Sequence, residues 1–309
     1  ARAITLVENR DPLAYEVVAD LYPETGSAYA VGLTGPPGVG KSSLVAALVR
    51  HVRARGTEVG VVSVDPSSPF SQGALLGDRI RLADHFLDPG VFIRSMGTRG
   101  HLGGLSEATL QALLVLDAAG KELVFLETVG SGQSEVEVVG VADTVLLVLM
   151  PGSGDSVQAL KAGIMEIPDV IAINKMDHPA AKTMLNEVRS ILALDRGREW
   201  NPPIVLTEAV RGENVAELWE RIAEHRAYLE QSGRLEERRR ASLAREVFSL
   251  ASGRAKRHLE RTVADDPELR RLLDEVQRRE LDPLTAVREI LDKVFHIHDE
   301  RDAHGTRAS

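Results

Sequence analysis

A glycine-rich segment near the start of the chain carries residue types that bind phosphate. Residues 35–42 read G-P-P-G-V-G-K-S and match the pattern G-x-x-x-x-G-K-S. An apolar run at 29–33 precedes the segment and a helical pattern follows it, which disfavours a chance match. Backbone N–H groups of such a turn converge on phosphate oxygens at a helix N-terminus. We therefore predict a nucleotide-binding loop formed by Gly35, Pro36, Pro37, Gly38, Val39, Gly40, Lys41, Ser42 and Ser43.

Within this loop, two side chains have predicted roles. The ammonium of Lys41 would neutralise the β- and γ-phosphates, and the hydroxyl of Ser42 would bind Mg²⁺.

Acidic residues follow two of the predicted strands. Asp65 ends the apolar run 59–64, where its carboxylate would reach the metal or orient an attacking water, or else cap the next turn. Asp78 is a second candidate for the metal site. Glu127 begins E-T-V-G after the run 123–126, in the place of the D-x-x-G element of GTPases, and Gln133 is a candidate for orienting water.

A third motif predicts which nucleotide base the site binds. Residues 174–177 read N-K-M-D about 130 residues after the phosphate loop. The carboxylate of Asp177 would accept hydrogen bonds from guanine N1–H and its exocyclic amine, which adenine does not offer. Asn174 would brace the neighbouring loops and the Lys175 stem would cover the base. The segment Thr207, Glu208, Ala209 loosely matches the loop whose backbone contacts guanine O6.

These motifs follow apolar runs separated by helical patterns. The runs at 30–33, 59–64, 123–126, 144–150, 170–173 and 204–206 predict strands buried on both faces. The alternation predicts an α/β fold with a doubly wound, mostly parallel sheet, in which ligands bind beyond the carboxyl ends of the strands. We expect a helical lead-in at 1–28, a nucleotide-binding domain at 29–229 and a helical arm at 230–309. The glycine-rich residues 93–104 are expected to form a loop.

Composition limits the function classes. The chain has 309 residues, a net charge of −9 and no cysteine. The charge disfavours nucleic-acid partners, and the absence of cysteine excludes disulfides and thiolate chemistry. No apolar run is long enough to cross a membrane. We therefore expect a cytoplasmic protein without a membrane partner.

The motifs together resemble one family. Besides those above, the chain contains V-D-P-S-S, L-L-G-D-R-I-R, F-I-R-S-M-G-T-R-G-H-L-G-G-L and P-G-S-G-D-S-V-Q. The series closely resembles the MeaB/ArgK-type P-loop GTPases, relatives of the methylmalonic aciduria type A protein, over residues 1–229.

The resemblance implies a specific function. Members bind and hydrolyse GTP with Mg²⁺ and act as chaperones of cobalamin-dependent acyl-CoA mutases. They gate adenosylcobalamin loading and protect or reactivate the mutase. They are typically homodimers joined through C-terminal helices. Because this chain contains no D-x-H-x-x-G signature of cobalamin binding, we expect the cobalamin to be bound by the partner. The resemblance also implies an acidic cluster of Asp65, Asp78 and Glu127 around the metal and water, and a catalytic role for Lys161 in a third switch segment.

Three alternatives stay open from the residues. The first is an ATP-dependent kinase linked to basic amino-acid transport, which N-K-M-D disfavours. The second is a GTPase that inserts nickel or cobalt into another enzyme, which the lack of cysteine disfavours. The third is a binding module whose hydrolysis is incidental.

Overall fold

The computed structural model describes residues 1–9, 11–65, 82–97, 104–128, 140–152, 168–194, 197 and 199–296. The chain forms two compact units, Ala1–Glu246 and Val247–Ser309. Within the described ranges, no helix has both the length and the apolar character needed to cross a membrane.

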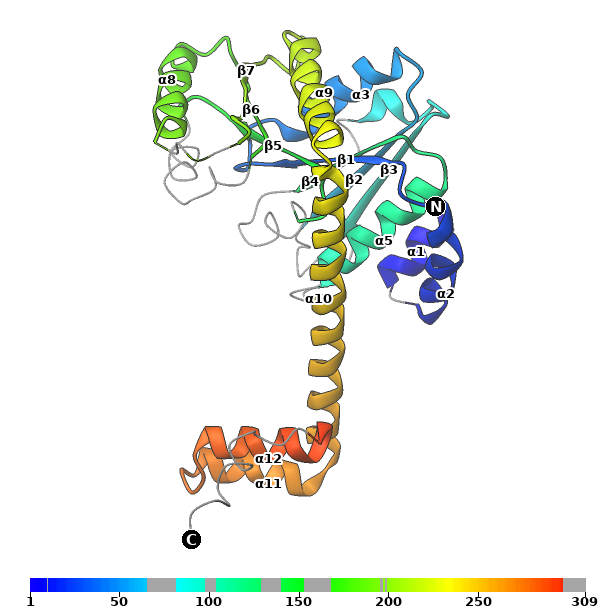
Figure 1. The fold of residues 1–309 in the computed structure, drawn as a ribbon, viewed down its shortest axis with the longest axis vertical. Helices are drawn as coiled ribbons and strands as arrows, with labels where there is room; N and C mark the ends of the chain where they lie inside the picture. The colour runs from blue at the N-terminus through cyan, green and yellow to red at the C-terminus, as the bar shows by residue number, and fades with distance from the viewer. Residues whose placement is uncertain are drawn as a thin grey trace. The chain divides into compact units, whose positions relative to one another are not determined.

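The first unit is built on a seven-stranded sheet in the order β3-β2-β4-β1-β5-β6-β7, and every strand pair is parallel (Figure 1). The strands are β1 Tyr29–Thr34, β2 Val59–Asp65, β3 Val91–Gly97, β4 Leu123–Thr128, β5 Thr144–Leu149, β6 Val170–Ile173 and β7 Ile204–Leu206. Six of them confirm the strands predicted from the apolar runs. The predicted doubly wound α/β fold is therefore confirmed.

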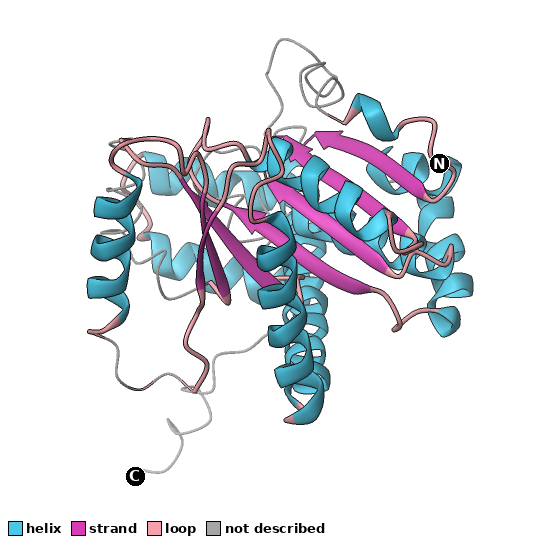
Figure 2. Ribbon diagram, turned by 90° about the horizontal axis from the view of Figure 1, so that it is seen from above, coloured by secondary structure: helices cyan, strands magenta, loops and turns pink. Residues whose placement is uncertain are grey.

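Helices cover both faces of this sheet (Figure 2). Helices α3 (Lys41–Arg53) and α9 (Val215–Gln231) lie on one face. On the other face, α5 (Gly104–Ala118) and α1 (Arg2–Asn9) cover β2 and β4, while α8 (Ala181–Leu192) covers β5 and β6. Helix α2 (Pro12–Leu21) packs on α1 and α5, and two short 3₁₀ turns lie at Tyr22–Glu24 and Ala83–His85. The predicted helical lead-in is thus present as α1 and α2.

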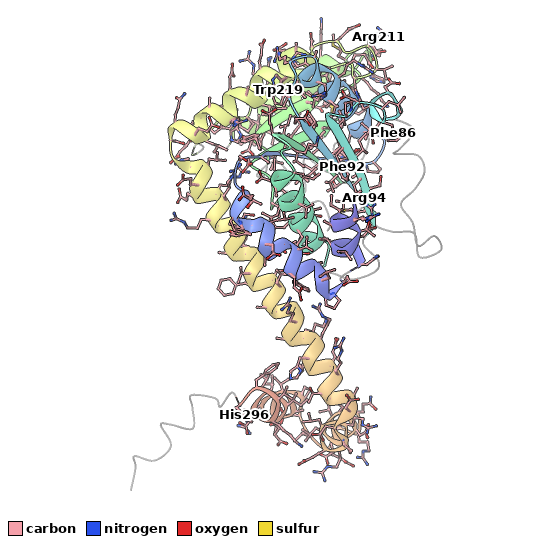
Figure 3. The ribbon with its side chains drawn as sticks, turned by 90° about the vertical axis from the view of Figure 1, so that its right-hand side faces the viewer. Phe86, Phe92, Arg94, Arg211, Trp219 and His296 are labelled. Carbon is pink, nitrogen blue, oxygen red and sulfur yellow. The ribbon has the colours of Figure 1, made fainter. Side chains whose placement is uncertain are left out.

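Strand β3 corrects the expectation of a loop at 93–104. Residues Val91–Gly97 pair with the whole of β2, and Met96 is buried. The charged residue Arg94 interrupts the apolar pattern, but its guanidinium reaches Thr5 Oγ1 at 3.2 Å and the carboxylate of Glu8 on α1 (Figure 3). Strand β3 lies at the edge of the sheet, and the charged Arg94 breaks its apolar run. The alternation of apolar and polar residues was therefore too weak to predict the strand.

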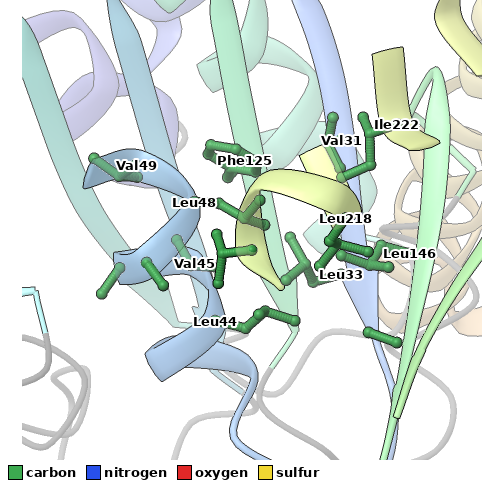
Figure 4. Close-up of a cluster of buried hydrophobic side chains, with 14 of the residues drawn as sticks. Val31, Leu33, Leu44, Val45, Leu48, Val49, Phe125, Leu146, Leu218 and Ile222 are labelled. Carbon is green, nitrogen blue, oxygen red and sulfur yellow. The ribbon is translucent and has the colours of Figure 1, made fainter. Parts of the chain in front are cut away.

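The largest apolar cluster lies between the sheet and the pair α3 and α9 (Figure 4). Leu44 and Leu48 of α3 recur at helical spacing and are completely buried against strand residues such as Phe125. Burial of one such leucine contributes about 1.5–3 kcal/mol relative to exposure. This cluster fixes the start of α3, and therefore the phosphate loop, relative to β1.

A buried polar network ties α9 to the amino ends of the strands. The hydroxyl of Thr144 lies 2.5 Å from Tyr29 Oη and 2.8 Å from His225 Nδ1. His225 Nε2 lies 3.4 Å from Asp169 Oδ1, and Asp169 Oδ2 accepts from Val145 N at 2.8 Å. All four side chains are largely buried, so each hydrogen bond replaces one lost to water.

Two arginines at the start of α10 (Arg234–Asp265) extend this network. Arg238 binds both oxygens of Asp169 at 3.1 and 2.9 Å. Arg239 binds both oxygens of Asp143 at 2.8 Å and also donates to the carbonyls of Gly26 and Ala28. Bidentate pairs of this kind fix orientation as well as charge. The first turns of α10 therefore belong to the first compact unit.

The second unit contains the rest of α10 and the helices α11 (Pro267–Gln277) and α12 (Pro283–Phe295). Asp266 and Asp282 cap α11 and α12, and each is followed by proline at the first helical position. Leu269, Leu272 and Ile290 form a small core. Several large apolar side chains of this unit stay exposed: Val247, Phe248, Leu273, Leu284 and Val287.

The buried His225 predicts a pH dependence of stability. Burial lowers the pKa of His225 below 6.5, although the nearby Asp169 opposes that shift. Below that value the unfolded chain takes up a proton that the folded chain resists, so stability falls with falling pH, by at most about 1.4 kcal/mol per pH unit for one proton. We expect His225→Gln to flatten this dependence in urea unfolding between about pH 7.5 and about pH 5.

The exposed His258 offers the matched control, because His258→Gln should keep the wild-type slope. Equal slopes for His225→Gln and wild type would contradict the assignment.

Candidate nucleotide-binding site

The phosphate loop connects β1 to α3, and its glycines are required by close contacts. Gly35 has φ +137° and Gly40 has φ +95°, conformations that L side chains rarely adopt. A Cβ on Gly35 would lie 2.1 Å from the carbonyl oxygen of Val148, and one on Gly40 would lie 2.4 Å from Asn174 Nδ2. The loop is therefore held directly against β5 and the N-K-M-D segment.

Lys41 and Ser42 begin α3 at the mouth of this loop, and both are buried. The ammonium of Lys41 donates to the carbonyls of Gly35 and Pro36, the second at 3.1 Å. The hydroxyl of Ser42 donates to Glu127 Oε1 at 2.6 Å, and Glu127 is 1% exposed. The hydroxyl and the carboxylate present hard oxygen ligands side by side, which fits Mg²⁺.

Of the other predicted site residues around the metal and the water, the structure describes only Asp65. Asp65 is the last residue of β2, and its neighbour Val64 pairs with Thr128, directly after Glu127. The backbone thus brings the end of β2 beside the end of β4. Asp78, Gln133 and Lys161 lie outside the described residues. Their proposed roles stay predictions.

Asn174 connects the three loops of the site. Its Nδ2 donates to the carbonyl of Val39 in the phosphate loop at 2.9 Å. Its Oδ1 accepts from Ala209 N at 3.1 Å and lies 3.4 Å from Thr207 Oγ1. The side chain is 3% exposed. Because one buried amide uses both its ends, it fixes the N-K-M-D segment and the turn after β7 relative to the phosphate loop.

The residues after Asn174 extend this connection. Lys175 has φ +59°, which is uncommon for a residue with a side chain. This conformation places its ammonium 3.4 Å from the carbonyl of Gly38. Met176 N donates to Thr207 O at 3.0 Å. Asp177 then lies at the surface, with a side chain 53% exposed.

Two further side chains lie against Asp177, and their arrangement was not predicted. Arg211 Nη2 lies 3.7 Å from Asp177 Oδ2. The buried carboxyl of Glu208 accepts a hydrogen bond from Val210 N at 3.4 Å. Burial and the neighbouring Asp177 raise the pKa of Glu208, although Arg211 partly offsets this. Sequence reasoning missed Arg211, because it lies in a turn with no periodic or motif signal.

Comparison with known proteins identifies the family. The family model described as methylmalonyl Co-A mutase-associated GTPase MeaB matches residues 1–264. The chain belongs to the MeaB family. It is therefore a GTPase of a family associated with methylmalonyl-CoA mutase.

Individual relatives agree with this MeaB assignment. A Pyrococcus abyssi protein that carries the name of a GTPase is 49% identical to this chain over 299 residues. The matched region covers 96% of this chain and 92% of that protein. The GTPase ArgK of Escherichia coli is 34% identical over 299 residues, 94% of this chain and 90% of that protein. The solved structure of a LAO/AO transport system kinase has a TM-score of 0.72 and 28% identity, covering 95% of this chain and 92% of that one. The resemblance stated from the motifs is thus confirmed.

The bridging role of Asn174 predicts the effect of a nearly isosteric change. Asn174→Asp replaces the donor to Val39 with an acceptor, which leaves the buried carbonyl unpaired at a cost of about 1–3 kcal/mol. We expect guanine-nucleotide affinity to fall at least about tenfold, measured by fluorescence titration with a labelled GDP.

Asn186→Asp, the same change at an exposed position of α8, is the control and should bind as wild type. Unchanged affinity in Asn174→Asp would show that the loops keep their positions without this amide.

Proposed function

We propose that this chain binds GTP with Mg²⁺ and hydrolyses it to gate adenosylcobalamin loading into a cobalamin-dependent acyl-CoA mutase such as methylmalonyl-CoA mutase. In this role it protects or reactivates the mutase in the cytoplasm. The observation that carries the proposal is the Asn174 bridge, which links a phosphate loop to a guanine-type motif within a MeaB-family chain. This arrangement favours a nucleotide held at both its phosphates and its base.

The proposed chemistry is an in-line attack of water on the γ-phosphate. Lys41 and the N–H groups of the phosphate loop would neutralise the charge that develops on the phosphate oxygens. Asp65 and Glu127 would position the water. When bound, Mg²⁺ would lie with Ser42, Asp65, Asp78 and Glu127 and would supply further charge neutralisation.

At the base end, Asp177 would accept hydrogen bonds from guanine N1–H and the 2-amino group. Asn174 and Lys175 would hold the surrounding loops, and the backbone of Thr207, Glu208 and Ala209 would face the remaining edge of the base.

The second compact unit, Val247–Ser309, supports the proposal of a homodimer. Its exposed apolar residues, including Phe248 and Leu284, support a homodimer formed through the helical arm 230–309. The cobalamin would be bound by the mutase rather than by this chain alone.

The similarity to the solved LAO/AO transport system kinase keeps a kinase linked to basic amino-acid transport as a second candidate. That reaction would use ATP, so base selectivity separates the two. Insertion of nickel or cobalt has less support: no group of three or more His, Cys, Asp or Glu suited to a metal occurs in the described part of the chain.

Recognition of guanine by Asp177 predicts which nucleotide the variant Asp177→Asn should bind. The carboxylate accepts two hydrogen bonds from guanine, each worth about 1.5–3 kcal/mol when charged, so the variant should bind GTP at least about 100-fold more weakly. Xanthine carries a carbonyl where guanine has its 2-amino group, and the new amide can donate to it. We expect the variant to prefer XTP in competition titrations that also include ATP.

The exposed Asp84, changed to Asn, is the matched control and should keep the wild-type preference for GTP. A variant Asp177→Asn that still prefers GTP would contradict guanine recognition by this residue, and a wild type that prefers ATP would favour the kinase.

The partner is tested by hydrolysis with and without the mutase. We expect slow steady-state GTP hydrolysis by the isolated chain and a rate at least about tenfold higher with the cobalamin-dependent acyl-CoA mutase of the same genome. Lys41→Ala should abolish both rates. An isolated chain as fast as the mixture would argue against a mutase-stimulated cycle.

A further inference from the structure

An arginine on the turn after β7 contacts the carboxylate that is predicted to read the base. Residues 208–213 form a closed turn, in which Glu208 and Glu213 exchange both backbone hydrogen bonds at 3.2 and 3.1 Å. Arg211 lies in this turn, and its Nη2 is 3.7 Å from Oδ2 of Asp177. The side chain of Arg211 therefore reaches from the turn after β7 to the N-K-M-D segment after β6.

The same guanidinium also contacts a second acid. Arg211 Nη1 lies 3.6 Å from Oε1 of Glu213, so two nitrogens of one planar group face two carboxylates. All three side chains are exposed, and Figure 3 shows Arg211 at the surface of the first unit. A single exposed ion pair contributes little, but a cation that spans two acids restricts the direction of each. The two contacts together make Arg211 a bridge between Glu213 and Asp177.

The charges at this end of the predicted site explain why Asp177 needs the bridge. Glu208 and Glu213 lie in the same turn, so acidic side chains accumulate beside Asp177. The ammonium of Lys175 is directed to the phosphate loop. Because like charges repel at short range, an exposed aspartate without a cationic neighbour would turn toward water. The guanidinium of Arg211 offsets this repulsion and keeps the Asp177 carboxylate at the site.

We propose that Arg211 is a positioning residue for guanine recognition, which holds Oδ2 of Asp177 so that the carboxylate meets the base in a fixed orientation. This inference rests on the proposed function, since it assumes that Asp177 contacts guanine. A carboxylate oxygen accepts more than one hydrogen bond, so the guanidinium and the base share the group. An aspartate that is already oriented loses less freedom when guanine binds. Glu213 anchors the guanidinium, and Arg211 acts through Asp177 without touching the nucleotide.

The experiment compares GDP with IDP, whose base lacks the 2-amino group. Calorimetric titrations of the full chain with Mg²⁺ give a GDP-to-IDP preference, in which the contribution of the identical phosphates cancels. Arg211→Gln removes the charge and should lower this preference about threefold, the size expected for an exposed ion pair. Arg211→Lys keeps the charge but loses the planar fork that spans two carboxylates, so it should recover only part of the preference.

Salt gives a second readout that a purely structural role would not change. Raising NaCl from about 0.1 M to about 1 M shortens the Debye length from about 10 Å to about 3 Å. The wild-type preference for GDP should fall over this range toward that of Arg211→Gln. The preference of Arg211→Gln should stay constant, because the ion pair that salt screens is already absent.

Two single variants complete the first set. Arg221→Gln makes the same change at an arginine that forms an ion pair with Glu224 within α9, and it should follow wild type. Glu213→Gln removes the anchor of the guanidinium and should lose part of the preference. Melting curves check that each variant is folded.

A pair of double variants tests whether Arg211 acts through Asp177. The variant Asp177→Asn, which we expect to bind xanthine nucleotides, serves as the background, and the affinity for XDP is measured. Adding Arg211→Gln should change this affinity no more than adding Arg221→Gln does, because the carboxylate that Arg211 orients is gone. A larger loss with Arg211→Gln would mean that the guanidinium contacts the nucleotide directly, and it would overturn action through Asp177.

The outcomes separate the two levels of inference. A preference in Arg211→Gln that equals or exceeds that of wild type, or a wild-type preference that salt does not change, overturns the positioning role and leaves the GTPase function standing. Equal preferences in Glu213→Gln and wild type overturn the anchoring role of Glu213. A wild type without any preference for GDP over IDP overturns guanine recognition by Asp177, and the role of Arg211 with it.

Discussion

The structure of the site depends on one buried side-chain amide. Asn174 donates to the phosphate loop and accepts from the turn after β7, so two loops that are far apart in the chain are held by one group. The fit is tight, because a single Cβ on Gly40 would meet this amide at 2.4 Å. A buried amide with both ends paired has one favourable orientation. The distance between the phosphate loop and the turn after β7 is therefore fixed by the chain itself.

This fixed geometry needs a rigid frame, and the opposite end of the sheet supplies it. Asp143 and Asp169 precede β5 and β6, and each binds one arginine of α10 through both oxygens. The same strands lead, at their carboxyl ends, to the loops of the site. The charged groups at the amino ends are paired with arginines of α10, while those at the carboxyl ends, such as Lys41 and Glu127, are paired within the loops of the predicted site. The two ends of one sheet thus differ in what their polar residues hold together.

Much of this could be predicted from the sequence, for physical reasons. The strands that carry the motifs are buried on both faces, so they appear as continuous apolar runs, and the motifs at their ends fall in the order of a nucleotide site. Edge strand β3 could not be found this way, because Arg94 is satisfied by Glu8 of a distant helix. The Arg239–Asp143 pair was equally hidden, since it joins residues 96 positions apart.

The arrangement around Asp177 shows the limit of motif reading most clearly. N-K-M-D predicts the carboxylate that reads the base, but not the side chains that lie beside it. Glu208 lies in a segment that resembles a loop known for its backbone contacts with guanine. Only the burial of its side chain, which is 7% exposed, indicates that this side chain has its own role in the structure. A carboxyl buried there without a partner would be costly, and Glu208 accepts a hydrogen bond from Val210 N at 3.4 Å. The motif thus predicts the residue types at the ends of the strands, whereas the neighbours that each side chain meets follow only from the fold.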